Sequence, residues 1–277
     1  MNPALWLVIN PESGSNAPET VSAVTAALAA AGHAPARTVP IGQGMPTAAE
    51  LDRASVGTVA VLAGDGTVNA VANALEGSGR RLLVLPGGTA NLLARELHGD
   101  RPADVVARNF AALAVRRRTC IRTNFGTALI EVLAGPGAIW SEVREEMRGG
   151  DVSSVAGKTV EAIRQSTSAP RVELLDPKGG NPAGYAGVRL EATDAGIWVE
   201  GFGAETVSDY LQQGLALLRR NFREGPHDDL GHHAAVRCRS LGNEPIALMI
   251  DGERREGSAQ ERFLLAPFAL DLLASPG

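Results

Sequence analysis

The feature that most limits the fold is a repeated unit in the first third of the 277-residue chain: an apolar run, a glycine-bearing polar turn and then a helical pattern. The apolar runs are short enough to be strands buried on both faces. They cover residues 5–9, 58–63 and 82–85. Helical patterns follow from residue 18, over 68–75 and over 90–97. This alternation predicts a mostly parallel sheet with helices on both faces.

After Arg118 the pattern changes to short strand-like runs separated by Gly and Pro. They cover residues 128–133, 171–175, 188–192, 197–202, 234–239 and 246–250. Such a series predicts a β-rich second domain, with helical insertions at 140–165 and 207–222. We therefore expect an α/β domain over 1–117, which residues 265–277 are candidates to complete, and a β-sandwich domain over 118–264.

Composition excludes several classes of protein. The formal net charge of −5 argues against a nucleic-acid partner, since neutralising phosphates requires a basic surface. The two cysteines, Cys120 and Cys238, are too far apart for a zinc ribbon and are expected to be reduced and buried. No apolar stretch is long enough to span a membrane or to serve as a signal peptide. We expect a cytoplasmic protein, in which any contact with a membrane would be made from the surface of its inner face.

The strongest chemical signal is the turn Gly64-Asp65-Gly66-Thr67, between a buried strand and a helix that we expect to begin at Thr67 or Val68. Glycines let the backbone approach an anion closely, and the free N–H groups of a helix start favour negative charge. Asp65 repels phosphate directly, so its expected role is to meet a bridging Mg²⁺ or to hydrogen-bond a nucleotide. A plain strand-to-helix turn remains the alternative.

Two further turns are placed to join it. Residues 10–15 follow the first strand, and residues 86–91 follow the third, with Thr89 as the expected N-cap of the next helix. Because parallel strands end on the same side of a sheet, the three turns should meet at one edge, where open α/β sheets bind ligands.

The order of these motifs resembles the diacylglycerol, sphingosine and ceramide kinase catalytic-domain family. The matching segments are Asn-Pro-x-Ser-Gly from Asn10, Gly-Asp-Gly-Thr from Gly64, Pro-x-Gly-Thr-x-Asn from Pro86, and Asp-Gly-Glu from Asp251. The resemblance implies an NAD kinase- and phosphofructokinase-like domain joined to a β-sandwich. It also implies a kinase that transfers a phosphoryl group from ATP and Mg²⁺ to the hydroxyl of a diacylglycerol- or sphingoid-type lipid.

The resemblance also assigns residues. Those implied to contact the nucleotide are Asn10, Ser13, Gly14, Thr38, Gly64, Asp65, Gly66, Thr67, Asn69, Gly88, Thr89 and Asn91. Asp251 and Glu253 are implied to receive the proton of the lipid hydroxyl, and Asp65 to meet the Mg²⁺ of Mg-ATP. A carboxylate that orients the acceptor hydroxyl suits phosphoryl transfer, which depends on positioning and charge neutralisation.

Two other functions stay open on the sequence alone: an NAD kinase-like enzyme with a non-lipid acceptor, and a nucleotide- or lipid-binding protein without catalysis. Ala63, Ala70 and Leu92 depart from the family pattern. Ala63, Leu92 and the displaced Asp194 keep the second alternative open, whereas Asp65, Asp251 and Glu253 argue against it. Three weaker candidates are interpreted as structural. Asp194 lies one residue away from a family metal ligand, residues 226–233 are expected to form a solvated loop, and residues 116–118 a solvated domain edge.

Overall fold

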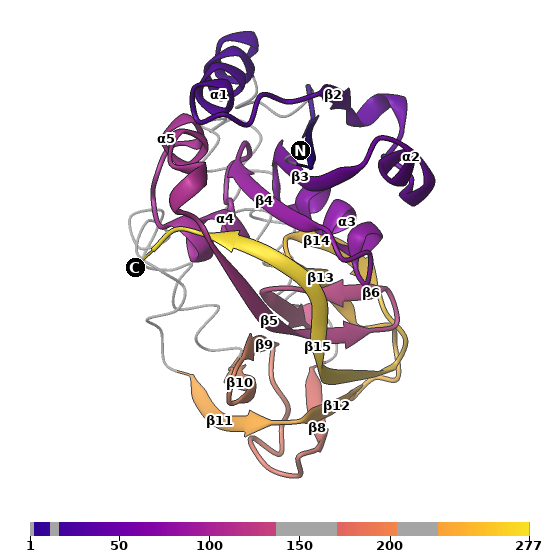
Figure 1. Cartoon of the computed structure of the whole chain (residues 1–277). Helices are drawn as coiled ribbons and strands as arrows, with labels where there is room; N and C mark the ends of the chain where they lie inside the picture. Colours follow the sequence, from indigo (N-terminus) through magenta and orange to yellow (C-terminus); the bar gives the residue numbers. More distant parts are fainter. Residues whose placement is uncertain (1–2, 12–16, 137–170, 204–226, 277) are drawn as a thin grey trace, which may run out of the picture. The chain divides into compact units, whose positions relative to one another are not determined.

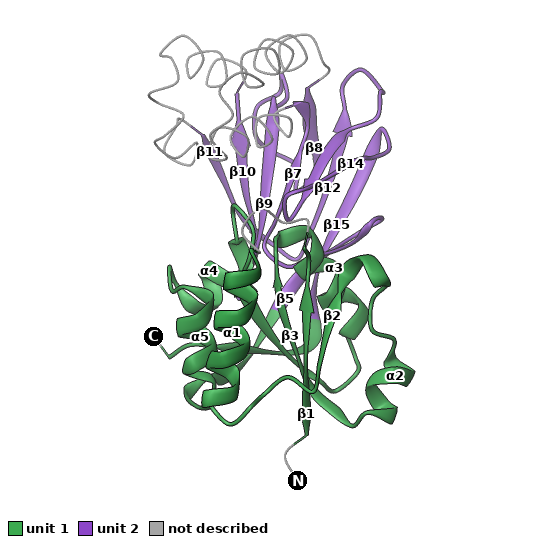
Figure 2. Ribbon diagram, turned by 90° about the horizontal axis from the view of Figure 1, so that it is seen from above, with its two compact units in different colours: residues 1–118, 268–277 green, residues 119–267 purple. Residues whose placement is uncertain are grey.

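A computed structural model describes residues 3–11, 17–136, 171–203 and 227–276 (Figure 1). The chain divides into two compact units, residues 1–118 with 268–277 and residues 119–267 (Figure 2). The long strand β15 (Gln260–Ala274) begins in unit 2 and ends in unit 1. The helical insertions expected at 140–165 and 207–222 lie outside the described residues.

Unit 1 is built on a parallel sheet with the strand order β2-β1-β3-β4-β15. Its other strands are β1 (Ala4–Ile9), β2 (Arg37–Pro40), β3 (Val56–Ala63) and β4 (Arg81–Pro86). The central strands are apolar on both faces because helices cover both. Figure 2 shows α1 (Pro18–Ala30) and α5 (Ala103–Arg108) on one face, and α2 (Ala48–Arg53) and α3 (Asp65–Leu75) on the other.

The core of unit 1 explains which residues form these elements. Helix α1 begins at Pro18, whose missing N–H costs nothing at a helix start, and its buried side chains face α5 and the sheet. They join alternate residues of β1, β3 and β4 in one apolar cluster, which includes Leu7, Val24, Leu28, Leu62 and Val106. Helix α4 (Leu92–His98) follows β4, and two 3₁₀ turns, η1 (Ile41–Gln43) and η2 (Phe110–Ala112), complete the unit.

Unit 2 contains a six-stranded antiparallel sheet and the antiparallel strands of the nine-stranded sheet, in agreement with the β-rich domain that the sequence predicted. The six-stranded sheet has the order β11-β10-β9-β7-β13-β14. The nine-stranded sheet contributes β8, β12 and the first part of β15, with β5 and β6 beside them. The strands are β5 (Ala114–Thr123), β6 (Gly126–Ala128), β7 (Glu131–Ala134), β8 (Val172–Asp176), β9 (Gly187–Thr193), β10 (Gly196–Phe202), β11 (Asp228–His233), β12 (Ala235–Ser240), β13 (Ala247–Ile250) and β14 (Glu253–Glu256).

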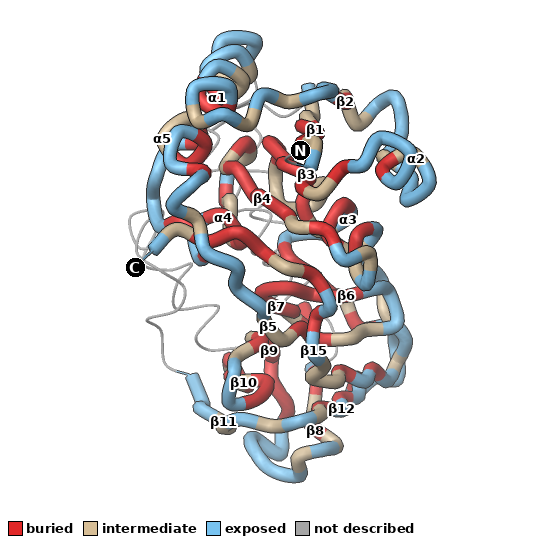
Figure 3. Tube along the Cα trace, viewed as in Figure 1, coloured by how far each residue is buried: buried red, intermediate tan, exposed pale blue. Residues whose placement is uncertain are grey.

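One apolar core joins the two sheets of unit 2, as in a β-sandwich. Buried side chains from both sheets meet in it, among them Val132, Leu190, Val236 and Phe263. Cys238 belongs to this core and Cys120 is fully buried, so the expectation of two free, buried cysteines is confirmed. Figure 3 shows the buried residues gathered along the central strands of each unit. The α/β and β-sandwich fold classes are confirmed.

Two local expectations are wrong. The run at 128–133 is split into β6 and β7. Residues 116–118 lie inside β5 at the boundary of unit 1, and Arg116 and Arg117 are exposed, as expected of a solvated domain edge; Arg117 donates to Asp271 at 2.8 Å and Arg118 to Glu96 at 2.7 Å. The expected loop at 226–233 contains β11, an edge strand paired with β10. An edge strand faces solvent on one side, so its polar composition hid it. None of the helices among the described residues is both long and apolar enough to cross a membrane.

Candidate functional site

The ends of three neighbouring strands bring the polar turns of unit 1 together. β3 lies between β1 and β4, and both pairs run parallel, so all three strands end at the same edge of the sheet. Backbone hydrogen bonds continue past the strand ends, from the N–H of Asn10 to the carbonyl of Leu62 and from the N–H of Gly87 to that of Ala63. The turns after β3 and β4 are therefore held side by side.

The two glycine turns touch at Gly64 and Gly88. A Cβ atom added to Gly88 would collide with the Cα of Gly64, and one added to Gly64 would lie 3.6 Å from the Cα of Gly88. This contact explains why glycine is required at position 88, where φ itself is ordinary. The close approach leaves a surface of bare backbone at the sheet edge, the kind of surface that can follow a phosphate chain.

Asp65 links the first glycine turn to the helix after the second. Helix α3 begins at Asp65 itself, two to three residues earlier than expected, so this carboxylate lies in the first turn where the helix dipole favours it. Its Oδ1 also accepts a 2.7 Å hydrogen bond from the N–H of Leu92, the first residue of α4. One half-buried carboxylate thus serves two helix starts.

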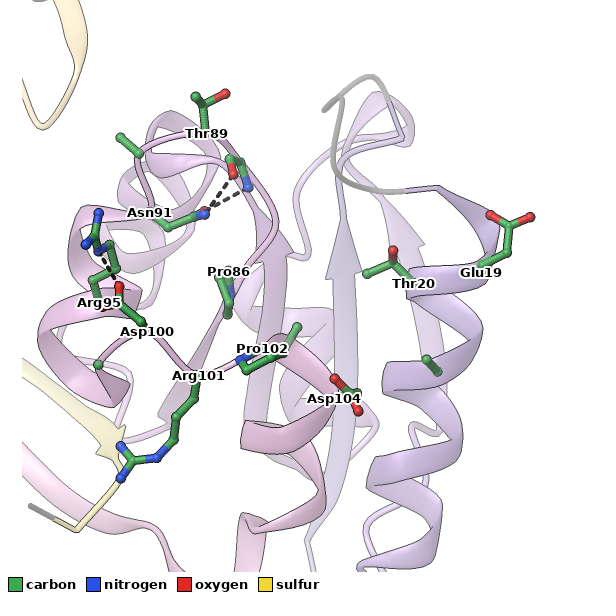
Figure 4. Close-up of a pocket in the computed structure, with 15 residues that line it drawn as sticks. Glu19, Thr20, Pro86, Thr89, Asn91, Arg95, Asp100, Arg101, Pro102 and Asp104 are labelled. Carbon is green, nitrogen blue, oxygen red and sulfur yellow. Dashed lines mark hydrogen bonds and ion pairs between the residues drawn. The ribbon is translucent and has the colours of Figure 1, made fainter. Parts of the chain in front are cut away.

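Asn91, rather than Thr89, is the N-cap residue of α4, which corrects the expected cap. Its backbone is left-handed, with φ +51°, a conformation that Asn tolerates better than most residues. Its side-chain oxygen accepts from the N–H groups of Gly87 at 3.1 Å and Gly88 at 2.8 Å, and its amide donates to the Gly88 carbonyl at 2.7 Å. Thr89 is exposed at the tip of the turn (Figure 4).

The first turn reaches the same place through Asn10. Its side-chain amide lies 3.4 Å from the hydroxyl of Thr67, in the first turn of α3. Asn69, also on α3, accepts hydrogen bonds from the side-chain amide of Asn73 at its backbone carbonyl and at its side-chain oxygen. Thr38 lies exposed on β2, the strand beside β1. Ser13 and Gly14 lie outside the described residues.

A cavity of about 720 Å³ opens beside the second glycine turn (Figure 4). This volume is within the range of small-molecule sites. Its walls are the first turn of α1, the turn at 86–91 and the segment at 99–104. Figure 4 shows Glu19 and Thr20 on the α1 side and the Arg95–Asp100 ion pair, 2.9 Å long, on the α4 side. The cavity could hold the part of a ligand whose phosphates follow the glycine turns.

In unit 2, Asp251 and Gly252 form the two-residue turn of the β13–β14 hairpin, in which Ile250 pairs with Glu253. Both turn residues have positive φ, which matches a type I′ turn. The Asp251 carboxylate is buried and accepts hydrogen bonds from the N–H groups of Leu129, Ile130 and Glu131 at 2.6, 2.9 and 2.9 Å. It therefore holds the break between β6 and β7 that the sequence did not predict.

Glu253 has a different environment. Its side chain is 48% exposed and lies 3.5 Å from Arg255. Asp194 sits in the exposed β9–β10 turn. Among the described residues, no group of three or more His, Cys, Asp or Glu side chains is arranged to hold a metal ion.

Comparisons with known proteins agree with this arrangement. Residues 4–124 match the family model described as the diacylglycerol kinase catalytic domain. Residues 4–124 therefore contain a domain that is similar to the diacylglycerol kinase catalytic domain. A solved structure of a diacylglycerol kinase from Bacillus anthracis str. Sterne shares 15% sequence identity with the chain, at a TM-score of 0.65 over 99% of this chain and 98% of that one. Two further structures of a candidate diacylglycerol kinase from the same organism give TM-scores of 0.66 and 0.63, also at 15% identity, covering 99% of this chain and 98% and 97% of theirs. No curated protein matches the chain.

The match to this domain supports a lipid kinase in general terms, and the likeness to the solved structures is one of fold. Two features of the site were missed by sequence reasoning. The cap formed by Asn91 could have been found, because Asn is preferred at N-caps and at left-handed positions. The three N–H groups at Asp251 could not, since their donors lie about 120 residues earlier in the chain.

Proposed function

We propose that the chain is an ATP-dependent lipid kinase that phosphorylates a hydroxyl of a diacylglycerol- or sphingoid-type lipid. The observation that carries the proposal is the meeting of the three strand-end turns in unit 1. Asn10 reaches Thr67, Gly64 touches Gly88, and Asp65 accepts from Leu92. A plain structural turn would need none of these contacts between separate turns.

The residues present fit a nucleotide triphosphate with Mg²⁺. Bare backbone at Gly64 and Gly88, together with the start of α3, is suited to phosphate oxygens. Asp65 is one carboxylate at this edge, and Mg²⁺ commonly takes one or two carboxylates and completes its shell with water and phosphate oxygens. When bound, Mg²⁺ would neutralise charge on the phosphates during transfer.

The proposal assigns proton acceptance to the turn that carries Asp251 and Glu253. The different contacts of the two carboxylates suggest different roles. Three backbone donors already engage the Asp251 carboxylate, which fixes the hairpin, whereas the Glu253 side chain is half exposed. Glu253 is therefore the better acceptor of a proton from a substrate hydroxyl, and Asp251 orients the turn that presents it.

The test is phosphorylation of lipid extracts with Mg-ATP, with mass spectrometric identification of the products, together with a parallel reaction on NAD. We expect phosphorylated diacylglycerol or sphingoid lipid from the wild type. D65N keeps a side-chain oxygen that can accept from the N–H of Leu92 but removes the negative charge of Asp65. E253Q removes the negative charge of Glu253 and keeps the size of its side chain. Both should lower kcat at least 100-fold while the free energy of unfolding stays close to wild type.

Asp194 provides the matched control, because D194N removes an exposed carboxylate from a turn outside the site. Its activity should equal that of the wild type. Full activity in both D65N and E253Q would contradict the residue roles. Phosphorylation of NAD with no lipid product would contradict the acceptor class, and ATP binding without any product would indicate a binding protein.

A further inference from the structure

A second, smaller cavity lies at the opposite edge of the unit 1 sheet, where β1, β3 and β4 begin. It has a volume of about 270 Å³. Its floor is formed by Leu5, Thr58 and Arg81, which are paired across three neighbouring strands and so point to the same face. Gly64 lies six residues after Thr58 along β3, which corresponds to a distance of about 20 Å along the strand. The cavity is therefore separate from the glycine turns.

The floor carries polar groups that the rest of the chain does not satisfy. Thr58 is only 3% exposed, and in the described residues its hydroxyl has no hydrogen-bond partner. The Arg81 side chain is partly buried, and within the same part of the chain no carboxylate or carbonyl accepts from its guanidinium. A partly buried, unpaired cation costs free energy, which a ligand of matching chemistry would recover, and the Thr58 hydroxyl in the cavity floor is available to donate to the same ligand.

The charge around the cavity favours an anion. Asp271 pairs with Arg81 in register on the adjacent strand β15, but its carboxylate accepts a 2.8 Å hydrogen bond from Arg117. These three groups leave one net positive charge, placed on Arg81. His33 lies on the opposite wall, with its ring centroid 4.1 Å from that of Phe110. An arginine fork is matched by a carboxylate, which can accept two parallel hydrogen bonds.

The remaining walls are apolar and limit the size of the ligand. Phe110, Leu113 and Leu273 line the cavity above the polar floor. At about 30 Å³ for each water-sized group, the volume holds about nine non-hydrogen atoms. We propose that this cavity binds a small monocarboxylate, with its carboxylate on Arg81 and Thr58 and its apolar part against Phe110 and Leu113.

The test is a ligand-observed NMR titration of the full chain with benzoate, whose size and shape fit the cavity. Benzoate should bind saturably to the wild type. R81Q should raise its Kd at least tenfold and T58V, which keeps the shape of the side chain, several-fold. R53Q removes an exposed arginine from α2, on the other face of the sheet, and should leave the Kd unchanged.

Benzamide, a neutral molecule of the same shape, and inorganic phosphate, which lacks the apolar part, should each bind at least tenfold more weakly than benzoate. Absence of saturable benzoate binding to the wild type would overturn the proposal. So would equal Kd values for wild type, R81Q and T58V, or equal binding of benzamide. The titration measures binding and needs no catalysis. A lack of benzoate binding would therefore not bear on the proposed kinase function, and a lack of kinase activity would not bear on this cavity.

Discussion

Replacing Arg189 in unit 2 should destabilise the protein strongly, because its cation is buried among three carboxylates. The guanidinium lies on β9 with only 7% of the side chain exposed. It donates to Glu131 at 2.7 Å and to Glu200 at 2.6 Å, and it also pairs with Glu191. Burial opposes its charge, but the three carboxylates outweigh burial and raise the pKa of Arg189.

The magnitude follows from what R189M would leave behind. The Glu131 and Glu200 side chains are 9% and 4% exposed, so two carboxylates would stay buried without their cation. Breaking a buried ion pair by removing one partner costs about 3–5 kcal/mol, a large part of the roughly 5–15 kcal/mol that stabilises a typical domain. Urea unfolding followed by circular dichroism would measure the loss.

The matched control is R239M, which removes an arginine of unit 2 whose ion pair with Glu173 is exposed. Exposed pairs contribute about 0–1 kcal/mol, so R239M should be nearly neutral. The triple variant R189M/E131Q/E200Q should recover part of the loss, since it also removes the buried charges. Equal losses for R189M and R239M, or a loss below about 1 kcal/mol for R189M, would refute the reasoning.

Four further outcomes are expected. Burial lowers the pKa of His98 to about 4, so as the pH falls the unfolded chain binds a proton before the folded chain does. The free energy of unfolding should therefore fall between about pH 6.5 and 4. Urea unfolding at pH 7 and pH 5 would measure this fall, which should be smaller in H98N. Y185F removes a hydroxyl that donates to Asp228 and accepts from the N–H of Asn181, and should cost about 1–3 kcal/mol in the same assay. G88A should weaken ATP binding in calorimetry at least tenfold, whereas G42A, where a Cβ meets open space, should not. Burial raises the pKa of Cys238 to about 12, so the thiol should react with a disulfide reagent only after denaturation.

Sequence reasoning found the parts of the fold in which local and tertiary preferences agree. β3 and β4 were readable because buried parallel strands are apolar at every position, and glycine turns follow both. The same rule failed at β5 and β11, whose arginines, aspartates and histidines follow no apolar pattern. β5 pairs with the adjacent β6 but also with the distant β15, and β11 pairs with β10, which does not adjoin it in the chain, so a local window contains only part of this pairing.

The candidate site divides in a similar way. The spacing of the turns placed Gly64 and Gly88 at one edge, because strand order alone requires it. The start of α3 at Asp65 was missed because it depends on a contact between turns, from the N–H of Leu92 to Asp65. The cap at Asn91 depends on bonds within its own turn, from the N–H groups of Gly87 and Gly88, and a preference for Asn could have revealed it. Whether a carboxylate such as Asp251 is buried by backbone donors is likewise a tertiary property.

The return of β15 to unit 1 has a consequence for synthesis on the ribosome. Asp271 and Leu272 pair with the start of β4, and the N–H of Ser275 bonds to the carbonyl of Leu97. Until residues 271–275 emerge, β4 remains an open edge that other nascent chains could join. A nonsense codon before residue 271 would thus leave unit 1 incomplete and prone to aggregate.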